Sequence, residues 1–121
     1  MLLKNLYTIT SFEKEDSILN ASIHLNKKHA IFNGHFPDNP VMPGVCMIQI
    51  IKELTEQALN VELFMEKSSN IKFMLLINPE INTDLTLELE ITKEDTTVKV
   101  KNVTKFEDTL ALKFNGTYRI V

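Results

Sequence analysis

A histidine followed by a proline-rich loop and an apolar run is the part of this sequence best suited to chemistry. The loop from His35 to Gly44 contains three of the chain's four prolines, which are Pro37, Pro40 and Pro43. Proline fixes φ and lowers the entropy lost when a loop becomes ordered. A histidine held beside a helix N-terminus could remove a proton next to a carbonyl, because backbone N–H groups there stabilise the developing oxyanion. The same residues also fit a loop that only redirects the chain, so spacing alone does not define a reaction.

Residues 44–59, GVCMIQIIKELTEQAL, predict a helix that is mostly buried. No Gly or Pro interrupts the run after its first residue, and Pro43 suits the start of a helix. The polar side chains form one narrow stripe, made of Gln49, Lys52, Glu53 and Glu56. Because the rest of the circumference is apolar, other elements must cover this helix on most sides.

The remaining chain has the patterns of β-strands. Apolar residues alternate with polar ones, or β-branched and aromatic residues gather, at 6–12, 17–25, 85–91, 98–100 and 110–120. Turn signals lie at 78–84 (NPEINTD) and 93–95 (KED). One helix with five or six antiparallel strands predicts a single α+β domain over residues 1–121, in which a curved sheet wraps the helix. Such a sheet leaves an edge strand unpaired, and dimerisation through that edge is a common solution.

Composition and charge exclude several classes of protein. The net charge of −3 and the single arginine, Arg119, argue against binding to nucleic-acid phosphates. The single cysteine, Cys46, excludes an intrachain disulfide and a cysteine-based zinc site, and fits a reducing compartment. No apolar run approaches the roughly 20 residues of a membrane span or forms a signal peptide. We therefore expect a cytoplasmic protein without a nucleic-acid or membrane partner.

The segment GHFPDNPVMPGV at 34–45 resembles the signature GHFPxxPxMPGV of the β-hydroxyacyl-(acyl carrier protein) dehydratases, which have the hotdog fold. SSNIKFMLLINPE at 68–80 resembles the strand and turn that follow the helix in that family. The resemblance implies a helix wrapped by an antiparallel sheet and a dimer with two sites at its interface. It also implies conversion of a 3-hydroxyacyl thioester to the trans-2-enoyl thioester, as in fatty acid biosynthesis. The substrate would be carried on the phosphopantetheine of acyl carrier protein.

The resemblance also implies partners and cofactors. The partners it implies are acyl carrier protein and a second copy of the chain, in a homodimer or higher homo-oligomer. Because Gln49 stands at the position of the family's acid, the sequence also fits a heterodimer with a dehydratase paralogue. No metal, flavin or nucleotide is implied.

Two residues of the motif take catalytic roles by this resemblance. His35 matches the catalytic histidine, and Gly44 matches the glycine whose backbone N–H polarises the thioester carbonyl. The remaining residues expected to contact the substrate are Phe36, Met42, Pro43 and Val45.

The chain departs from the family at the acid. The family's Glu or Asp stands fourteen positions after the histidine, on the partner subunit's helix, and this chain has Gln49 there. A Gln cannot donate a proton, although its amide can hydrogen-bond a hydroxyl or hold a water. Loss of general acid catalysis costs on the order of 10²–10⁴-fold in rate.

Four residues further on, this chain has Glu53 where the family often has Gln. Lying about one turn, or roughly 5–6 Å, along the helix, Glu53 could supply the acid directly or through a water. Alternatively, it belongs to a solvent-facing polar stripe. With Gln49 acting alone, an acyl-thioesterase of the same fold or a non-catalytic acyl-thioester-binding subunit also fits the sequence.

Overall fold

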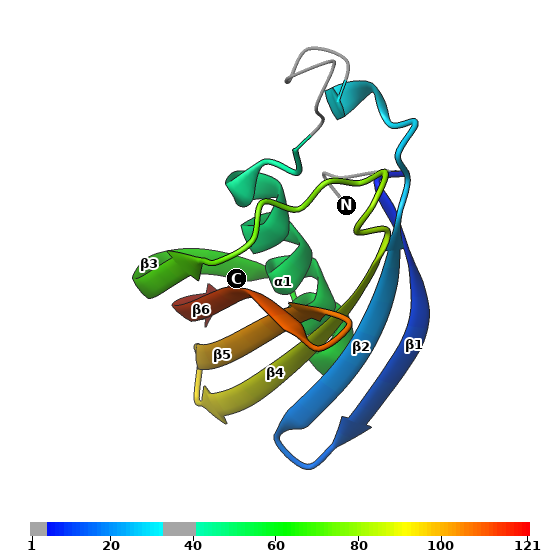
Figure 1. The fold of residues 1–121 in the computed structure, drawn as a ribbon. Coiled ribbons are helices and arrows are strands. Elements are labelled where there is room, and N and C mark those ends of the chain that lie inside the picture. The colour runs from blue at the N-terminus through cyan, green and yellow to red at the C-terminus, as the bar shows by residue number, and fades with distance from the viewer. Residues whose placement is uncertain (1–4, 33–40) are drawn as a thin grey trace.

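The computed structural model describes residues 5–32 and 41–121, and in this part of the chain one α-helix packs against one β-sheet (Figure 1). The elements are β1 (Tyr7–Glu15), β2 (Ile18–Leu25), the 3₁₀ turn η1 (Ala30–Phe32), α1 (Gly44–Leu59), β3 (Leu63–Phe73), β4 (Asp84–Glu94), β5 (Thr97–Phe106) and β6 (Thr109–Ile120). The predicted helix has the same bounds as α1. The α+β hotdog arrangement expected from the resemblance is confirmed.

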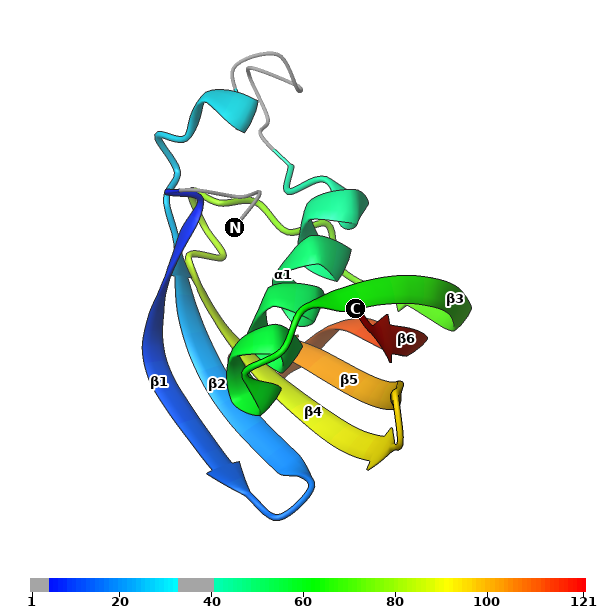
Figure 2. The same cartoon turned by 180° about the vertical axis from the view of Figure 1, so that it is seen from behind.

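The sheet is antiparallel throughout and has the strand order β1-β2-β4-β5-β6-β3. It curves around α1, which lies in the concave side, as the front and back views show (Figures 1 and 2). β1 and β3 form the two edges, so each of them has one strand neighbour.

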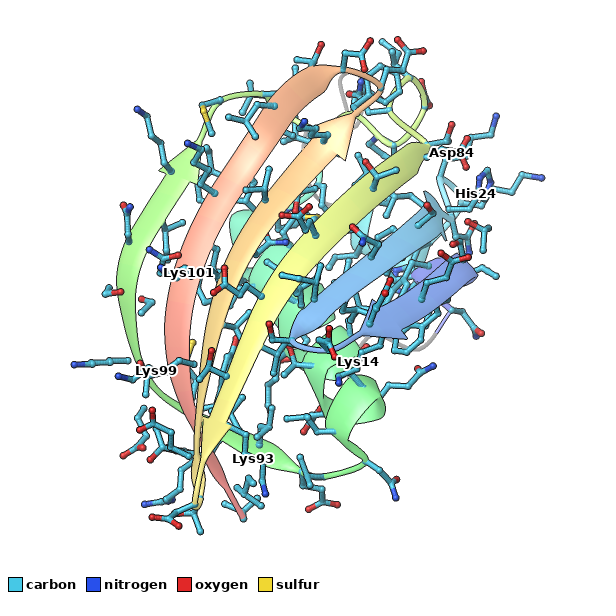
Figure 3. All side chains as sticks on the ribbon, turned by 90° about the horizontal axis from the view of Figure 1, so that it is seen from below. Lys14, His24, Asp84, Lys93, Lys99 and Lys101 are labelled. Atoms are coloured by element: carbon cyan, nitrogen blue, oxygen red, sulfur yellow. The ribbon has the colours of Figure 1, made fainter. Side chains whose placement is uncertain are left out.

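Alternation along the strands divides the sheet into an apolar concave face and a polar convex face. On β4 the residues that face α1 are almost fully buried, and these are Leu85, Leu87, Leu89 and Ile91. The three leucines pair with buried residues of β2, for example Leu89 with Leu19, and Ile91 pairs with Val100 of β5. Lys99 and Lys101 lie on the convex face, seen from below in Figure 3. There the exposed His24 Nδ1 lies 2.8 Å from Asp84 Oδ1.

α1 buries most of its circumference because the sheet surrounds it. Its buried side chains are Cys46, Met47, Ile50, Ile51, Glu53, Leu54 and Thr55. The helix begins after Pro43, which has an extended conformation and makes no side-chain cap. It ends at Asn60, whose φ of 55° is the left-handed conformation that closes many helices.

The structure differs from the sequence pattern at two places. The turn predicted at 93–95 is shifted, because β4 continues to Glu94 and the turn uses Asp95, which has a φ of 54° that aspartate tolerates. β3 shows no alternation of burial, since every residue after Leu63 is exposed. An edge strand that curves away from the core has no buried face to impose a period of two. Within residues 5–32 and 41–121, no helix is long and apolar enough to cross a membrane.

The central strand β4 should carry much of the stability of the fold. Leu87 is 1% exposed, and we expect Leu87→Ala to lower the free energy of unfolding by about 2–5 kcal/mol, because it leaves a cavity against α1. Urea unfolding followed by circular dichroism measures this change. Ile81→Ala is the control, since Ile81 is 66% exposed and its truncation should change stability by less than about 0.5 kcal/mol. Equal losses in the two variants would contradict the assignment of the core.

Candidate functional site

An apolar groove lies at the N-terminus of α1. It has a volume of about 400 Å³ and is lined by Val41, Met42, Pro43, Gly44, Val45, Met47, Phe73, Leu75, Leu76 and Ile77. The N–H of Met42 donates to the carbonyl of Ile77 at 2.7 Å, which ties the segment before α1 to the segment after β3. The structure therefore brings together four of the residues expected to contact a substrate, namely Met42, Pro43, Gly44 and Val45. Such a groove suits the apolar part of a small molecule.

The floor of this groove depends on the absence of a side chain at Gly44. A Cβ at this position would lie 2.7 Å from Cζ of Phe73, which is closer than real Cβ atoms approach a neighbour. Phe73 is the last residue of β3, so glycine lets this strand end come close to the start of the helix. A larger residue would push the aromatic ring into or out of the groove.

The first backbone N–H groups of α1 belong to residues at this same end of the helix, and Gly44 and Val45 border the groove. The Cys46 and Met47 N–H groups already donate to the Pro43 carbonyl, at 3.0 and 3.3 Å. The Gly44 and Val45 N–H groups precede them, and helix geometry provides no acceptor for these two within the helix. Together with the helix dipole, they favour a partial negative charge, such as that on a polarised carbonyl oxygen.

A buried hydrogen-bond cluster lies further along α1. Glu53 is 6% exposed and accepts two hydrogen bonds. The Tyr7 hydroxyl donates to Glu53 Oε1 at 2.8 Å, and Gln49 Nε2 donates to Glu53 Oε2 at 3.1 Å. The interpretation of Glu53 as a solvent-facing residue of the polar stripe is therefore wrong, because its carboxylate is buried and bonded to Tyr7 at the start of β1.

Tyr7 is the residue of this cluster that sequence reasoning missed. It begins β1, and 46 positions separate it from its partner on α1. Burial raises the pKa of Tyr7 well above its ordinary value of 10, and the hydrogen bond to Glu53 raises it further. The hydroxyl therefore keeps its proton and acts as the donor to Glu53. The sequence showed an aromatic residue in a strand, but nothing local identifies its partner.

Gln49 and Glu53 line a second groove, which shares no lining residue with the apolar one. It is bordered by Gln49, Lys52, Glu53, Glu56, Gln57, Asn60, Val61, Glu62, Leu63 and Val121. Gly44 and Gln49 are five residues apart, so their side-chain positions are separated by about 140° around the helix and about 7.5 Å along it. In one copy of the chain, the N-terminus of α1 and Gln49 therefore border different grooves.

Three further observations concern the motif, the single cysteine and metal binding. His35 and Phe36 lie outside the described residues. Cys46 is buried, and burial raises the pKa of its thiol, so the structure supports a core role for it. Among the residues that the structure describes, no group of three or more His, Cys, Asp or Glu side chains could hold a metal ion.

Comparison with known sequences shows that this chain is similar to dehydratases. Residues 11–113 match the profile of the ApeI-like family, described as ApeI dehydratase. A 3-hydroxyacyl-(acyl-carrier-protein) dehydratase FabZ from Lactobacillus helveticus is 29% identical, over 97% of this chain and 86% of the relative. The FabZ of a Caulobacter species is 33% identical over 66% of this chain. The matched region spans 54%, about half, of the length of this second relative.

Comparison with solved structures supports the fold. A chain of the dehydratase heterocomplex ApeI:P from Xenorhabdus doucetiae superposes with a TM-score of 0.75 at 18% identity, over 93% of this chain and 96% of that one. A hypothetical thioesterase protein with coenzyme A from Streptococcus pneumoniae gives a TM-score of 0.66 at 16% identity, over 95% and 85% of the two chains. At these identities, the similarity concerns the fold alone.

The two tyrosines of the chain, Tyr7 in the cluster and Tyr118 in the core, allow a direct test of their burial. Burial raises the pKa of both Tyr7 and Tyr118, and nearby Glu53 and Glu56, respectively, raise it further. Since the folded-state pKa is the higher one, the tyrosines add stability below about pH 10 that is lost as pH rises toward their folded pKa. We expect tyrosinate absorbance near 295 nm to appear only together with loss of the circular dichroism signal. In guanidinium chloride both residues should titrate near pH 10, and a folded protein that titrates there would contradict the burial of these hydroxyls.

Proposed function

Since this chain belongs to the ApeI-like dehydratase family, we propose that it removes water from a 3-hydroxyacyl thioester held on acyl carrier protein and forms the trans-2-enoyl thioester. The observation that carries this proposal is the apolar groove at the uncapped N-terminus of α1. It combines an apolar surface for an acyl thioester with two backbone donors for its carbonyl oxygen. No metal or other cofactor is required for this chemistry.

The helix N-terminus supports the role of Gly44 as the carbonyl anchor. When a proton leaves C2 of the substrate, negative charge develops on the thioester oxygen. Backbone N–H groups at Gly44 and Val45 would stabilise this charge more strongly in the transition state than in the ground state. Met42 and Pro43 line the same groove and would contact the apolar part of the substrate, and the motif gives Phe36 the same role.

The proposed base is His35, which the motif places before the proline-rich loop. Its imidazole would take the C2 proton, the C3–O bond would break, and the departing hydroxide would need a proton to become water. Gln49 would orient the hydroxyl but has no acidic proton to give. The proton can return from the imidazolium formed on His35 or come from Glu53.

A second subunit would complete the site. The carbonyl-binding groove and Gln49 face different directions in one copy, and they share no groove. Placing the apolar groove of one subunit against the Gln49 groove of another would join the two halves, as the resemblance implied. This supports either a homodimer or a heterodimer with a dehydratase paralogue.

The edge strand β3 is the proposed contact between subunits. It pairs with β6 on one side only, and its apolar side chains are exposed, including Phe64 (54%), Ile71 (38%) and Phe73 (48%). An unpaired strand edge with exposed apolar side chains is a template for pairing with another chain. Pairing of two β3 edges would extend the sheet across both subunits.

Two exposed lysines support docking of an acidic carrier protein. We expect this encounter to take place in the cytoplasm. Lys27 and Lys28 are exposed and lie between β2 and η1. This segment lies at the same end of the molecule as the N-terminus of α1 in both views (Figures 1 and 2). A carrier bound there would hold its phosphopantetheine arm near the apolar groove.

Dehydration can be tested directly by mass spectrometry of a 3-hydroxyacyl group on acyl carrier protein. We expect the purified chain to remove one water from the acyl group, and His35→Ala to slow this by about 10²–10⁴-fold through loss of the base. Lys99→Ala is the control, because Lys99 is exposed on the convex face, away from both grooves and from Lys27 and Lys28, and should leave the rate unchanged. Release of free carrier thiol would identify a thioesterase instead. Binding without either reaction would indicate a non-catalytic subunit.

The proposed subunit contact predicts the effect of charge on β3. We expect the wild-type chain to sediment as a dimer or larger oligomer, and Ile71→Glu to weaken association by at least about tenfold, because a charge would be buried at the paired edge. Analytical ultracentrifugation over a range of protein concentrations measures this. Ile81→Glu is the control, since Ile81 is also an exposed isoleucine (66%, against 38% for Ile71) but lies between β3 and β4. If Ile71→Glu and Ile81→Glu associate equally well, β3 is not the contact.

A further inference from the structure

The Gln49 side chain has a defined orientation in this structure. Its Nε2 donates to Glu53 Oε2 at 3.1 Å. The amide oxygen is bonded to the same carbon as this nitrogen, so it must point away from Glu53. Gln49 is half-buried and borders the second groove, and among the hydrogen bonds described its oxygen accepts none, so this oxygen is available as an acceptor.

The hydrogen bonds to Glu53 keep the Gln49 amide from flipping. The Tyr7 hydroxyl donates to its other oxygen at 2.8 Å, so both carboxylate oxygens act as acceptors. A flipped Gln49 would place two acceptor oxygens against each other in a buried site, which is costly. Because burial raises the pKa of Tyr7, its hydroxyl remains a donor across the working range of pH.

We propose that Tyr7 and Glu53 are positioning residues, which hold the Gln49 amide so that its carbonyl oxygen is offered to the hydroxyl of a 3-hydroxyacyl substrate. This inference deepens the proposed function and rests on it for the identity of the substrate. Glu53 then acts through Gln49 and is not the proton donor. An acceptor at this place also discriminates between substrates, because a 3-hydroxyl can donate to it and a 3-oxo group cannot.

Ligand binding tests this discrimination without relying on turnover. The probes are 3-hydroxyacyl and 3-oxoacyl pantetheine analogues in which an amide replaces the thioester, and calorimetry measures their affinities. We expect the wild-type chain to bind the hydroxy analogue about tenfold more tightly. We expect Glu53→Leu to reduce this preference to less than about twofold, because Gln49 can then rotate. A preference for the oxo analogue in the wild-type chain, or an unchanged preference in Glu53→Leu, would overturn the proposal.

The conservative variant Glu53→Gln separates positioning from acid catalysis. Its amide oxygen can still accept from Gln49, while its nitrogen donates to the Tyr7 oxygen, which can accept. We therefore expect the preference for the hydroxy analogue and the shape of the pH–rate profile to be kept, with dehydration within about threefold of wild type. A loss of about 10²-fold or more, together with loss of one limb of the pH profile, would make Glu53 the acid and overturn the proposal.

Side-chain NMR provides a readout that is independent of substrate. The Gln49 NH₂ group, assigned by its absence in Gln49→Leu, should shift in Tyr7→Phe and in Glu53→Leu. Thr55→Val is the control, because Thr55 is buried on the same helix and bonds only the Ile51 carbonyl among the hydrogen bonds described. Its substitution should leave the Gln49 signal in place. An unshifted signal in Glu53→Leu would overturn the proposal even if the dehydratase activity is real. Conversely, the expected shifts with no dehydration would refute the proposed function and keep the positioning.

Discussion

The packing of α1 into the concave face of the sheet is the constraint on which both grooves depend. Because the sheet curves around the helix, one side of α1 is buried, whereas its N-terminus and a polar stripe border the two grooves. The N-terminus lies where the segments around Met42 and Ile77 are joined by a backbone hydrogen bond. The accessible stripe contains Gln49. The fold thus presents two chemically different surfaces of one helix, an array of backbone donors at its start and a side-chain amide about one turn later.

Burial of the Glu53 carboxylate is the consequence of this packing that costs the most free energy. A carboxylate removed from water costs several kcal/mol unless its oxygens are hydrogen-bonded, and hydrogen bonds to charged groups contribute about 1.5–3 kcal/mol each. Tyr7 and Gln49 supply these bonds. An apolar residue would fill the same space at lower cost, so stability alone does not explain the carboxylate. Its effect on the orientation of Gln49 offers a reason.

The exposed apolar surface of the edge strand β3 connects the fold with the proposed association of subunits. The edge strand β3 has exposed apolar side chains, and its last residue, Phe73, forms part of the groove at Gly44. Association through this strand would therefore protect apolar surface and close the groove together. One subunit alone would lack a complete site, because its site residues, although on a single chain, border two different grooves.

The sequence by itself determined the helix, most of the strands and the motif that names the family. Each of these depends on local periodicity or on a contiguous pattern, as at residues 44–59 and 34–45. Tertiary structure decided which residues meet. The sequence pattern left Glu53 either in a polar stripe or near a site, and only the structure shows that it is buried and bonded to Tyr7. Contacts between residues 46 positions apart depend on strand order and sheet curvature, which no local pattern encodes.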